Sequence, residues 1–548
     1  MGISGLFMST TPVKPNRGPV QNIPGAKRQQ SSTISSNNDT DIMDICVIGG
    51  GVNGAGIARD AAGRGLSVVL LEKDDLAQGT SSRSGKLVHG GLRYLEYYEF
   101  RLVREALKER EVLLASAPHI IWPMRFVLPH SKEDRPAWLV RAGLFLYDHL
   151  GGRQRLAPTR VLNLSTAPEG AALKERYTKA FEYSDCWVDD ARLVVLNALD
   201  AKERGAQVLT HTHCDNAQRV NGVWKIDITD TLKGERSQIK ALSIINAAGP
   251  WVNRVIDTSS DVQSKRHVRL VKGSHIIVKK FWEGKQAYLI QNSDKRVIFI
   301  NPYEKNLALI GTTDVPFEGN PDEVSIDNSE IDYLISAVNR YFKRTLLRRD
   351  VLDSFSGVRP LFDDNTVNPS AVTRDYLFDV EAEEDAAPIL SVFGGKITTY
   401  RKLAEHALDK LQDFFPDVKP AWTSDTPLPG GDIVDADFEK FLAQLTERYR
   451  KLPGNLLLHY ARLYGSRCEH ILAGVCEVSD LGQQFSELCF EAEIRYLINH
   501  EWALTSDDIL NRRTKHALHM STEEQMSVAR WLKRHEAELN PGVITVVL

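Results

Sequence analysis

The chain has 548 residues, 42% of them hydrophobic and 26% charged, with a formal net charge of -4 and a sequence pI near 6.5. This composition is ordinary for a globular protein, and the length suffices for about three domains. The balanced charge lacks the basic excess of nucleic-acid-binding proteins, so no nucleic-acid partner is expected. Six scattered cysteines form no CxxC pair, and no metal site is predicted. No apolar run approaches the roughly 20 residues of a membrane-spanning helix, so we expect any membrane attachment to be peripheral.

The N-terminal residues 1–40 are rich in Ser, Thr, Asn, Pro and Gln and offer almost nothing that a core could bury. We predict a disordered extension there. From Ile42 the pattern changes. Residues 42–48 predict a buried strand, 53–63 an Ala-rich helix and 66–71 a second strand. Strand, glycine turn, helix and strand make one βαβ unit.

The turn of this unit satisfies GxGxxG at residues 49–54 (GGGVNG). In such a turn Gly49 permits the tight bend, Gly51 lets a pyrophosphate approach the backbone, and Gly54 lets the helix pack close to the strand. Glu72 lies eighteen residues after Gly54 (72 − 54), at the end of the second strand. A carboxylate at that position accepts hydrogen bonds from a ribose diol. The unit therefore predicts a dinucleotide-binding site.

Two further turns favour FAD over NAD as the dinucleotide. Residues 244–251 (IINAAGPW) form a strand that runs into a turn of small residues, which can pass a second time beside the nucleotide. Residues 392–400 (VFGGKITTY) place Gly394 and Gly395 at the start of an amphipathic helix, where N–H groups can face an electron-rich flavin edge. The chain has no second GxGxxG, so NAD would have no domain of its own.

The rest of the chain is rich in strands in its middle and helical at its end. Strand-like runs occur at residues 207–212, 223–230, 241–246 and 296–312. From about residue 432 the apolar residues take helical spacing, as at 435–449 and 487–497. Pro, Gly and Ser cluster at 420–431, and we place a domain boundary there.

Eight stretches, taken together, resemble the FAD-dependent (aerobic, respiratory) glycerol-3-phosphate dehydrogenase family. They are GGGVNGAGIARDAAGRGLSVVLLEK (49–73), SGKLVHGGLRYLE (84–96), YSDCWVDDARL (183–193), KGSH (272–275), GTTD (311–314), SGVRPL (356–361), TRDY (373–376) and FGGKITTYRKLAEHAL (393–408). The resemblance runs from about residue 42 to the C-terminus. The first stretch alone is shared by many flavoproteins.

The resemblance implies an α/β fold (α+β overall) with a Rossmann-type FAD-binding domain of the amino-acid-oxidase-like flavoprotein type. Residues 41–420 would form the oxidoreductase region, and residues 421–548 a helical C-terminal domain. Within the first region, a substrate-binding sheet at about 256–354 would be interleaved with FAD-binding segments at about 42–130, 183–255 and 355–415.

The activity that the resemblance implies is oxidation of sn-glycerol 3-phosphate to dihydroxyacetone phosphate, with electrons passed through FAD to membrane quinone. Similar bacterial proteins are peripheral on the cytoplasmic face of the cell membrane and homodimeric. A surface segment would then meet the lipid: either 137–150, or the basic stretches at 511–519 and 530–535. The alternatives are an oxidase that passes electrons to oxygen and a non-catalytic flavin-binding protein.

The reaction requires an anchor for a phosphate dianion and a base for the hydroxyl proton. Arg359 and Arg374, both at family substrate-site positions, are the predicted anchors, because guanidinium groups bind phosphate in a fork. Further substrate contacts are expected from Arg93, Tyr94, Thr312 and Lys396. His275 is the first choice as base and His89 its rival, and Arg359 also counts among the catalytic residues.

The cofactor is expected to contact the glycine turn, the Ser/Thr loop after the βαβ unit, and the two later turns. The predicted residues are Gly49, Gly50, Gly51, Asn53, Gly54, Glu72, Thr80, Ser81, Ser82, Lys86, Leu87, His89, Ala248, Gly249, Gly394, Gly395, Lys396, Ile397 and Thr398.

Overall fold

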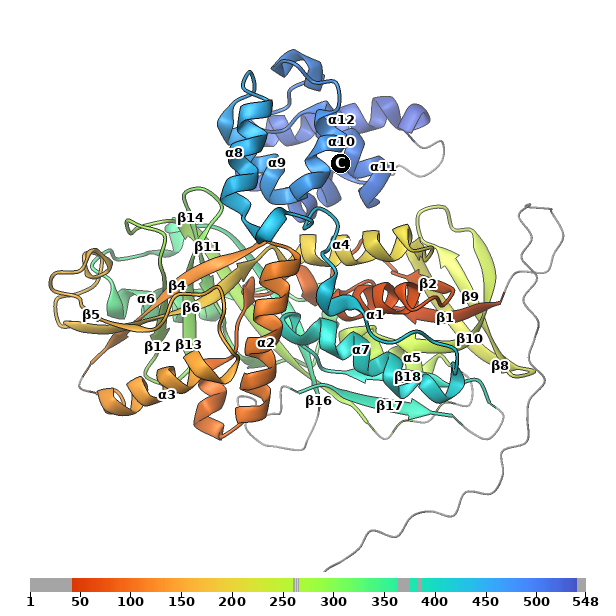
Figure 1. Cartoon of the computed structure of the whole chain (residues 1–548), viewed down its shortest axis with the longest axis horizontal. Coiled ribbons are helices and arrows are strands. Elements are labelled where there is room, and N and C mark those ends of the chain that lie inside the picture. The colour runs from red at the N-terminus through yellow and green to blue at the C-terminus, as the bar shows by residue number, and fades with distance from the viewer. Residues whose placement is uncertain are drawn as a thin grey trace, which may run out of the picture. The chain divides into compact units, whose positions relative to one another are not determined.

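The computed structural model describes residues 42–131, 133–259, 262, 264, 266–362, 375–382 and 386–539. The predicted N-terminal extension (1–40) and Arg374 lie outside these residues. The described chain is built on two sheets with helices around them (Figure 1).

The first sheet has eight strands and a parallel centre. The parallel strands lie in the order β18 (Ile389–Phe393), β10 (Arg236–Asn246), β1 (Met43–Ile48), β2 (Val68–Leu71) and β7 (Gln207–Leu209). β17 (Leu377–Glu381) pairs antiparallel with β18, and the ribbon of β8 (Thr212–Val220) and β9 (Val223–Asp230) joins through β10. The βαβ unit predicted from the sequence is therefore the middle of this sheet.

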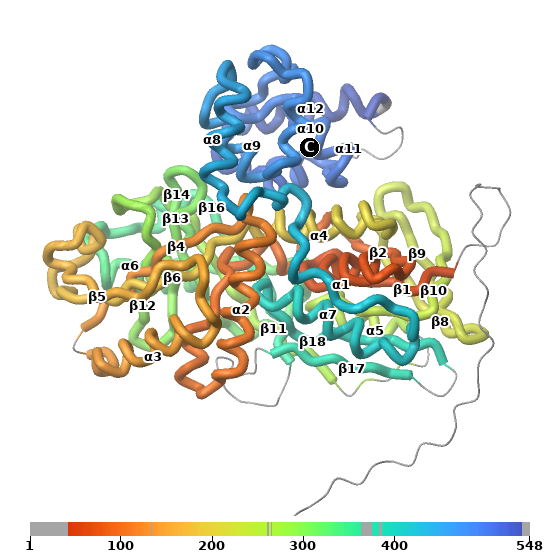
Figure 2. Tube along the Cα trace, viewed as in Figure 1, coloured from red at the N-terminus to blue at the C-terminus, as the bar shows by residue number. Residues whose placement is uncertain are grey.

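Helix α1 (Val52–Gly63) is covered by α4 (Asp190–Glu203) and α7 (Tyr400–Lys410). The helix can approach them closely because it is rich in Gly and Ala. A Cβ atom added to Gly56 would lie 2.7 Å from the ring of Tyr400, and one added to Gly63 would lie 2.1 Å from the ring of Trp422. Figure 2 shows how these first and late segments of the chain come together.

One predicted strand is divided in the structure. We expected residues 207–212 to be continuous, but β7 ends at Leu209 and β8 begins at Thr212. Between them His211 has φ +51°, a left-handed conformation that interrupts an extended strand. Thr212 then donates from its backbone N–H to the carbonyl of Glu72 at 2.7 Å, which places the turn beside the end of β2.

The second sheet has ten strands and carries the predicted site residues Leu87, His275 and Arg359. Its main path is β15 (Val315–Pro316), β11 (Val268–Lys279), β14 (Leu307–Gly311), β13 (Val297–Tyr303), β12 (Ala287–Gln291), β4 (Ile121–His130), β6 (Lys179–Val188) and β3 (Leu87–Val88). β16 (Val351–Phe362) pairs with β11, and β5 (Arg160–Asn163) pairs with β6. Helix α6 (Asn328–Tyr341) packs on this sheet through Leu334 and Val338.

Two helices, α2 (Phe100–Ser116) and α3 (Ala137–Leu150), pack against each other beside the second sheet. Their burial differs. α2 buries a full apolar stripe, whereas Leu144 and Tyr147 are the buried residues of α3. α3 therefore leaves several large apolar side chains exposed: Trp138, Leu139, Phe145 and Leu146.

The C-terminal part is helical, as predicted, and forms a core of its own around Tyr460, Leu497 and Trp531. Its helices are α8 (Phe438–Arg448), α9 (Gly454–Tyr464), α10 (Glu469–Leu472), α11 (Glu491–Glu501) and α12 (Thr522–Leu539). The predicted helices at 435–449 and 487–497 correspond to α8 and α11. None of the helices in the described ranges combines the length and the apolar character needed to span a bilayer.

Candidate active site

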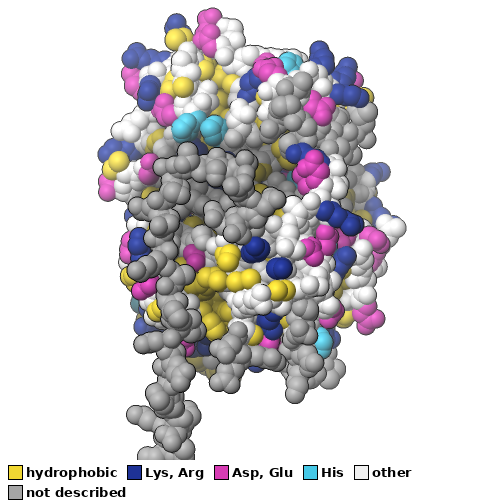
Figure 3. All heavy atoms as spheres, turned by 90° about the vertical axis from the view of Figure 1, so that its right-hand side faces the viewer, with side chains coloured by type: hydrophobic (Ala, Val, Ile, Leu, Met, Phe, Trp, Pro, Cys, Tyr) yellow, Lys and Arg dark blue, Asp and Glu magenta, His cyan; other side chains and the backbone are white. Residues whose placement is uncertain are grey.

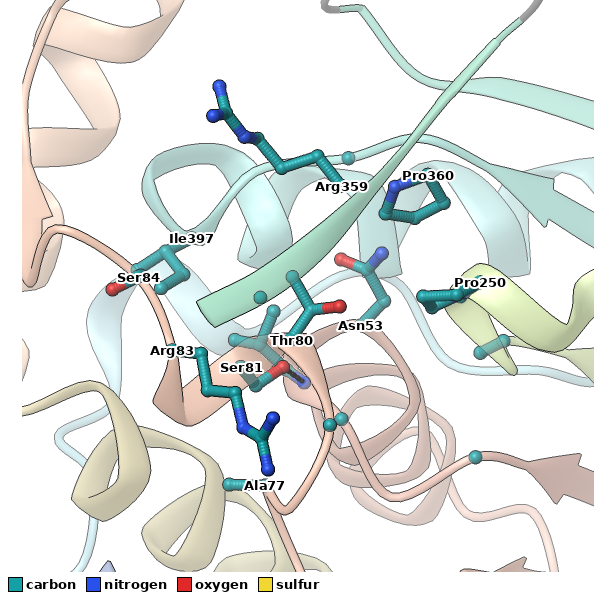
Figure 4. A pocket seen from close by; sticks show the side chains of 18 of the residues that line it. Asn53, Ala77, Thr80, Ser81, Arg83, Ser84, Pro250, Arg359, Pro360 and Ile397 are labelled. Atoms are coloured by element: carbon teal, nitrogen blue, oxygen red, sulfur yellow. Dashed lines mark hydrogen bonds between the residues drawn. The ribbon is translucent and has the colours of Figure 1, made fainter. Parts of the chain in front are cut away.

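The first cavity, about 410 Å³ in volume, lies at the carboxyl ends of β1, β2 and β10 and extends to β11 and β16. Figure 4 shows Asn53, Thr80 and Ser81 gathered near the start of α1, with Arg359 on a strand beyond them. Segments from the whole length of the oxidoreductase region thus line one space. Ligands of open α/β sheets bind at this position, outside the carboxyl ends of the strands.

The glycine turn has the geometry that a pyrophosphate needs. Gly49 has φ +110°, and a Cβ atom there would lie 2.6 Å from the carbonyl oxygen of Ala247. A Cβ atom on Gly54 would lie 1.9 Å from the carbonyl oxygen of Gly49, so the helix can approach the strand only through glycine. The hydroxyl of Ser81 accepts the N–H of Val52 at 2.9 Å and joins the Ser/Thr loop to the start of α1. The first-turn N–H groups of a helix have no partner within the helix and can bind phosphates.

An unpaired polar atom supports a dinucleotide at this place. The Oδ1 atom of Asn53 is buried and has no hydrogen-bond partner among the described residues, while its Nδ2 donates to the carbonyl of Gly394 at 3.2 Å. Gly394 and Gly395 have φ +83° and +101°, and a Cβ atom on Gly395 would lie 2.7 Å from the Asn53 amide. The residues present therefore fit FAD. The buried oxygen of Asn53 could accept a hydrogen bond from the cofactor, and the glycine backbone at 394–395 lines the cavity without side chains in the way.

Glu72 lines the first cavity directly after the end of β2. Its carboxylate accepts the N–H of Gly50 at 2.7 Å and that of Asp74 at 2.9 Å. Burial is the main effect on this group and raises its pKa to about 7, against the two backbone hydrogen bonds that lower it. Glu72 is thus held at the cavity wall, where a ribose would lie, by the same turn that would bind the phosphates.

His275 lies on β11, between Gly311 of β14 and Phe355 of β16. Its ring stacks on Phe355 at 4.9 Å, and Gly311 leaves room for it, because a Cβ atom there would lie 2.1 Å from the imidazole. Its Nδ1 is buried without a hydrogen-bond partner among the described residues. Burial, with the positive charges of Lys86 and Arg359, lowers the pKa of His275 to about 3. The imidazole is therefore neutral at neutral pH.

A second cavity of about 620 Å³ begins where the first one ends. Five residues line both cavities: His89, Tyr94, Phe299, Thr312 and Arg359. The Arg359 guanidinium is held at this junction by Asp314, at 2.7 Å, and by the carbonyl of Thr313, at 2.8 Å. The ammonium group of Lys396 lies 4.2 Å from the centre of the Tyr94 ring. Three of the predicted substrate contacts and one of the two predicted bases thus meet at the junction.

Most of the predicted site residues line the first cavity: Gly49, Gly51, Asn53, Glu72, Thr80, Ser81, Leu87, His89, Tyr94, Ala248, Gly249, His275, Thr312, Arg359, Gly394, Gly395, Lys396, Ile397 and Thr398. Arg93 lines the second cavity. Gly50, Gly54 and Ser82 line neither cavity, and Lys86 is buried in an ion pair with Asp190 at 2.8 Å. Arg374 lies outside the described residues.

Sequence reasoning missed Arg83 and Trp251, which also line the first cavity. Arg83 donates to the carbonyl of Ser356 at 3.1 Å, and burial is the main cause that lowers its pKa. It stands within the TSSRSG stretch already chosen as a cofactor loop, so a basic residue beside phosphate-binding hydroxyls was the available signal. Trp251 follows the turn of small residues and had no such signal.

A second cluster of ionisable groups lies far from the cavity, in the helical C-terminal part. Glu493 accepts from His459 at 2.7 Å, from His516 at 3.0 Å and from the hydroxyl of Tyr464 at 2.8 Å. The three acidic and imidazole groups are close enough to hold a metal ion. Their contacts, however, are those of hydrogen bonds, which satisfy the buried carboxylate without an ion.

Comparisons with known proteins agree with this architecture. A family model described as FAD dependent oxidoreductase matches residues 44–380, and one described as the C-terminal domain of alpha-glycerophosphate oxidase matches residues 421–540. D-erythritol 1-phosphate dehydrogenase of Brucella abortus (strain 2308) is 62% identical over 90% of this chain and 98% of its own length. Aerobic glycerol-3-phosphate dehydrogenase of Escherichia coli (strain K12) is 51% identical over 89% of this chain and 97% of its own length.

Among solved structures, the glycerol-3-phosphate dehydrogenase of Bacillus halodurans in complex with FAD is similar, with a TM-score of 0.69 and 27% identity. The match covers 92% of this chain and 95% of that one. The fold class and the cofactor predicted from the sequence are thereby confirmed. The chain belongs to the family of FAD-dependent oxidoreductases and is an enzyme that uses FAD.

Proposed function

We propose that this enzyme oxidises the secondary alcohol of a short polyol phosphate, sn-glycerol 3-phosphate first, and passes the electrons to a membrane quinone. The observation that carries the proposal is the junction of the two cavities. Arg359 and Thr312 line both cavities at this junction, and Lys396 lies beside it, against the ring of Tyr94. The two glycerol-3-phosphate dehydrogenases of Escherichia coli and Pseudomonas aeruginosa that are 51% identical to this chain support this choice of substrate.

In this proposal Arg359 binds the substrate phosphate. Asp314 and the carbonyl of Thr313 orient its guanidinium, so that little side-chain freedom is lost when an anion binds. Arg374 remains the predicted second anchor. Tyr94 lies at the same junction, and its neighbour Arg93 lines the second cavity.

His275 accepts the hydroxyl proton in this proposal. It is neutral, it lines the cavity, and Phe355 fixes the plane of its ring. FAD, when bound, supplies the acceptor for the hydride that leaves the carbinol carbon. His89 remains the rival base because it lies at the junction itself.

D-Erythritol 1-phosphate is a second candidate substrate. The 62% identity to a dehydrogenase of that name favours it. The second cavity adjoins the first one at Arg359 and Thr312 and adds volume at this junction, where a longer polyol can be accommodated. Both substrates share the phosphate and a secondary alcohol, and the chemistry proposed above applies to each.

The proposed quinone would approach through the second cavity. Its wall includes Tyr97, Tyr98 and Phe100, which are exposed aromatic side chains, together with residues of α3. On α3 itself Trp138 is 71% exposed and Phe145 61% exposed. Aromatic residues on an amphipathic helix are typical of an interfacial membrane segment.

The basic stretch at 511–519 is less suited to meet a membrane. Arg513, Lys515 and His516 are buried, and Arg513 and Lys515 are bound to the carboxylates of Asp75 and Asp189. We therefore propose α3 and its neighbours as the peripheral attachment surface, at the cytoplasmic face of the cell membrane. A homodimer stays a prediction of the resemblance.

The decisive experiment is anaerobic mixing of the purified yellow enzyme with substrate while the visible flavin absorbance is recorded. sn-Glycerol 3-phosphate and D-erythritol 1-phosphate are compared by kcat/KM, with glycerol as the control that lacks the phosphate. Rapid bleaching by one or both phosphates, and none by glycerol, is expected. If neither phosphate bleached the flavin, the proposed function would be wrong.

The acceptor is tested separately. With substrate present, slow oxygen uptake and fast reduction of a short-chain quinone are expected. Rapid oxygen uptake without added quinone would instead identify the oxidase alternative.

A further inference from the structure

The backbone around His89 is fixed from the FAD side by Thr398. The Thr398 hydroxyl accepts the N–H of His89 at 3.2 Å and lies 3.3 Å from the His89 carbonyl oxygen, to which it can donate. Thr398 follows the turn at 394–395, so this contact joins His89 to the segment that faces the cofactor groove. His89 lines both cavities, and its position therefore sets the shape of their junction.

From the opposite side, a buried polar set holds the next residue. The N–H of Gly90 donates to the Tyr147 hydroxyl at 2.7 Å, and Asp185 lies 3.4 Å from the same N–H. The Tyr147 hydroxyl donates to the Asp185 carboxylate, with distances of 2.8 and 2.9 Å to its two oxygens. Arg110 completes the set by donating to Asp185 at 2.7 Å. All four residues are buried.

Simple packing does not explain this choice of residues. A Cβ atom on Gly90 would lie 2.4 Å from Leu107 and 2.8 Å from the Tyr147 hydroxyl, so the loop can touch α3 only at a glycine. Burying a phenol, a carboxylate and a guanidinium requires a complete hydrogen-bond set, whereas apolar side chains of the same volume would fill the space without that requirement. The set is hydrogen-bonded to the loop beside the cavity through the Gly90 amide, and its Asp185 also lines the second cavity.

We propose that Tyr147, held by Asp185 and Arg110, is a positioning residue that fixes the His89–Gly90 peptide at the junction of the two cavities. The proposal rests on the proposed function, because the junction is where the substrate would bind. The role is exerted through the backbone, and Tyr147 itself lines neither cavity.

The test is Tyr147→Phe, which keeps the ring and its edge contact with Tyr183 (5.9 Å) and removes the hydroxyl. Tyr288→Phe is the matched control. Tyr288 is also fully buried, donates to the carbonyl of Glu169 at 2.8 Å, and lines neither cavity. Arg110→Lys serves as a second variant, should Tyr147→Phe fail to fold, because Arg110 lines neither cavity whereas Asp185 lines the second one.

Two readouts are recorded on the FAD-loaded enzymes. In Tyr147→Phe, amide hydrogen exchange of the peptide that contains residues 87–91 is expected to rise at least about 10-fold, because a hydrogen bond to Gly90 is lost. The flavin reduction rate at saturating substrate is expected to fall by about 10-fold or more with little change in KM, since small displacements in an active site are costly. Tyr288→Phe is expected to leave both unchanged.

Wild-type exchange at residues 87–91, or faster exchange without a slower reduction, would overturn the proposal. If wild-type enzyme were reduced by neither polyol phosphate, the proposed function would fail while the exchange result would still report on the backbone contact. The two failures are therefore distinguishable.

Discussion

At the scale of single residues, the state of His275 before catalysis is set by its surroundings. A general base has to be neutral before it accepts a proton, and the low pKa of about 3 ensures this over the whole physiological range. The same shift makes the imidazole a weak base. Its usefulness then depends on position, which Phe355 and the flanking Gly311 provide.

Replacement of His275 by Asn is expected to leave FAD bound and to slow flavin reduction by about 10²- to 10⁴-fold, the usual contribution of a positioned base. Stopped-flow reduction by substrate measures this. In wild-type enzyme the reduction rate should show no ionisation of His275 between pH 5 and 8. Reduction of the Asn variant at wild-type speed would move the role to His89.

Replacement of Arg359 by Leu is expected to raise KM for the phosphorylated substrate about 10- to 100-fold, because a hydrogen bond to a charged group contributes about 1.5–3 kcal/mol. The preparation should stay yellow. Steady-state kinetics with a quinone acceptor measure the effect, and unchanged KM would show that the phosphate binds elsewhere.

Glu72 gives a pH dependence to cofactor binding. Its folded-state pKa of about 7 lies above the ordinary value, so the carboxylate is ionised above pH 7 and protonated below it. An ionised carboxylate is the stronger acceptor for ribose hydroxyls. The affinity of apoprotein for FAD should therefore fall as the pH is lowered from 8 to 6, as measured by fluorescence quenching of FAD. Glu72→Gln should bind more weakly and lose this dependence.

At the scale of elements, the sequence predicts what is local. The strand, the turn and the helix at 42–63 each carry their own signal, and the structure has them with nearly the same bounds. At the break, His211 and Thr212 donate to the carbonyls of Asp74 and Glu72, contacts that a strand-like run in the sequence could not reveal. The role of Tyr147 could not be predicted from the sequence either, because its partner Gly90 is 57 residues away and the two meet only in the folded chain.

Helix α3 carries a prediction of its own. Trp138→Glu combined with Phe145→Glu places charges on its exposed apolar face and should weaken sedimentation with anionic lipid vesicles at least about 10-fold. Met526→Glu, at a 47% exposed apolar position of α12, is the control. Activity with a soluble dye acceptor should persist. Equal binding of both variants would place the attachment surface elsewhere.

At the scale of the whole chain, buried ion pairs join the C-terminal helices to the FAD-binding part. Arg192 of α4 and Glu501 of α11 are both fully buried and form a two-pronged ion pair. Arg513 binds both oxygens of buried Asp75 at 2.7 and 2.8 Å. On the face seen in Figure 3, by contrast, the visible charges of both signs are interspersed on the surface. We therefore expect the buried ion pairs to contribute more to stability than the exposed ones.

Glu501→Gln should destabilise the protein by about 3–5 kcal/mol, because it leaves the Arg192 charge buried and unpaired. Glu447→Gln breaks an exposed pair with Arg450 (72% and 75% exposed) and should stay within about 0.5 kcal/mol of wild type. Chemical unfolding followed by circular dichroism measures both. Similar losses in the two variants would contradict the importance given to the buried pair.

The bond between Asp75 and Arg513 has a consequence for the order of events during synthesis. Asp75 follows Glu72 by three positions, so the loop beside the expected ribose position is held by a side chain 438 residues further along the chain. A nascent polypeptide that has emerged only to residue 500 possesses every glycine of the turn yet lacks the counter-ion that seats this loop. We therefore expect flavin binding to follow the synthesis of Arg513, and ribosome-bound chains halted before this residue should remain colourless.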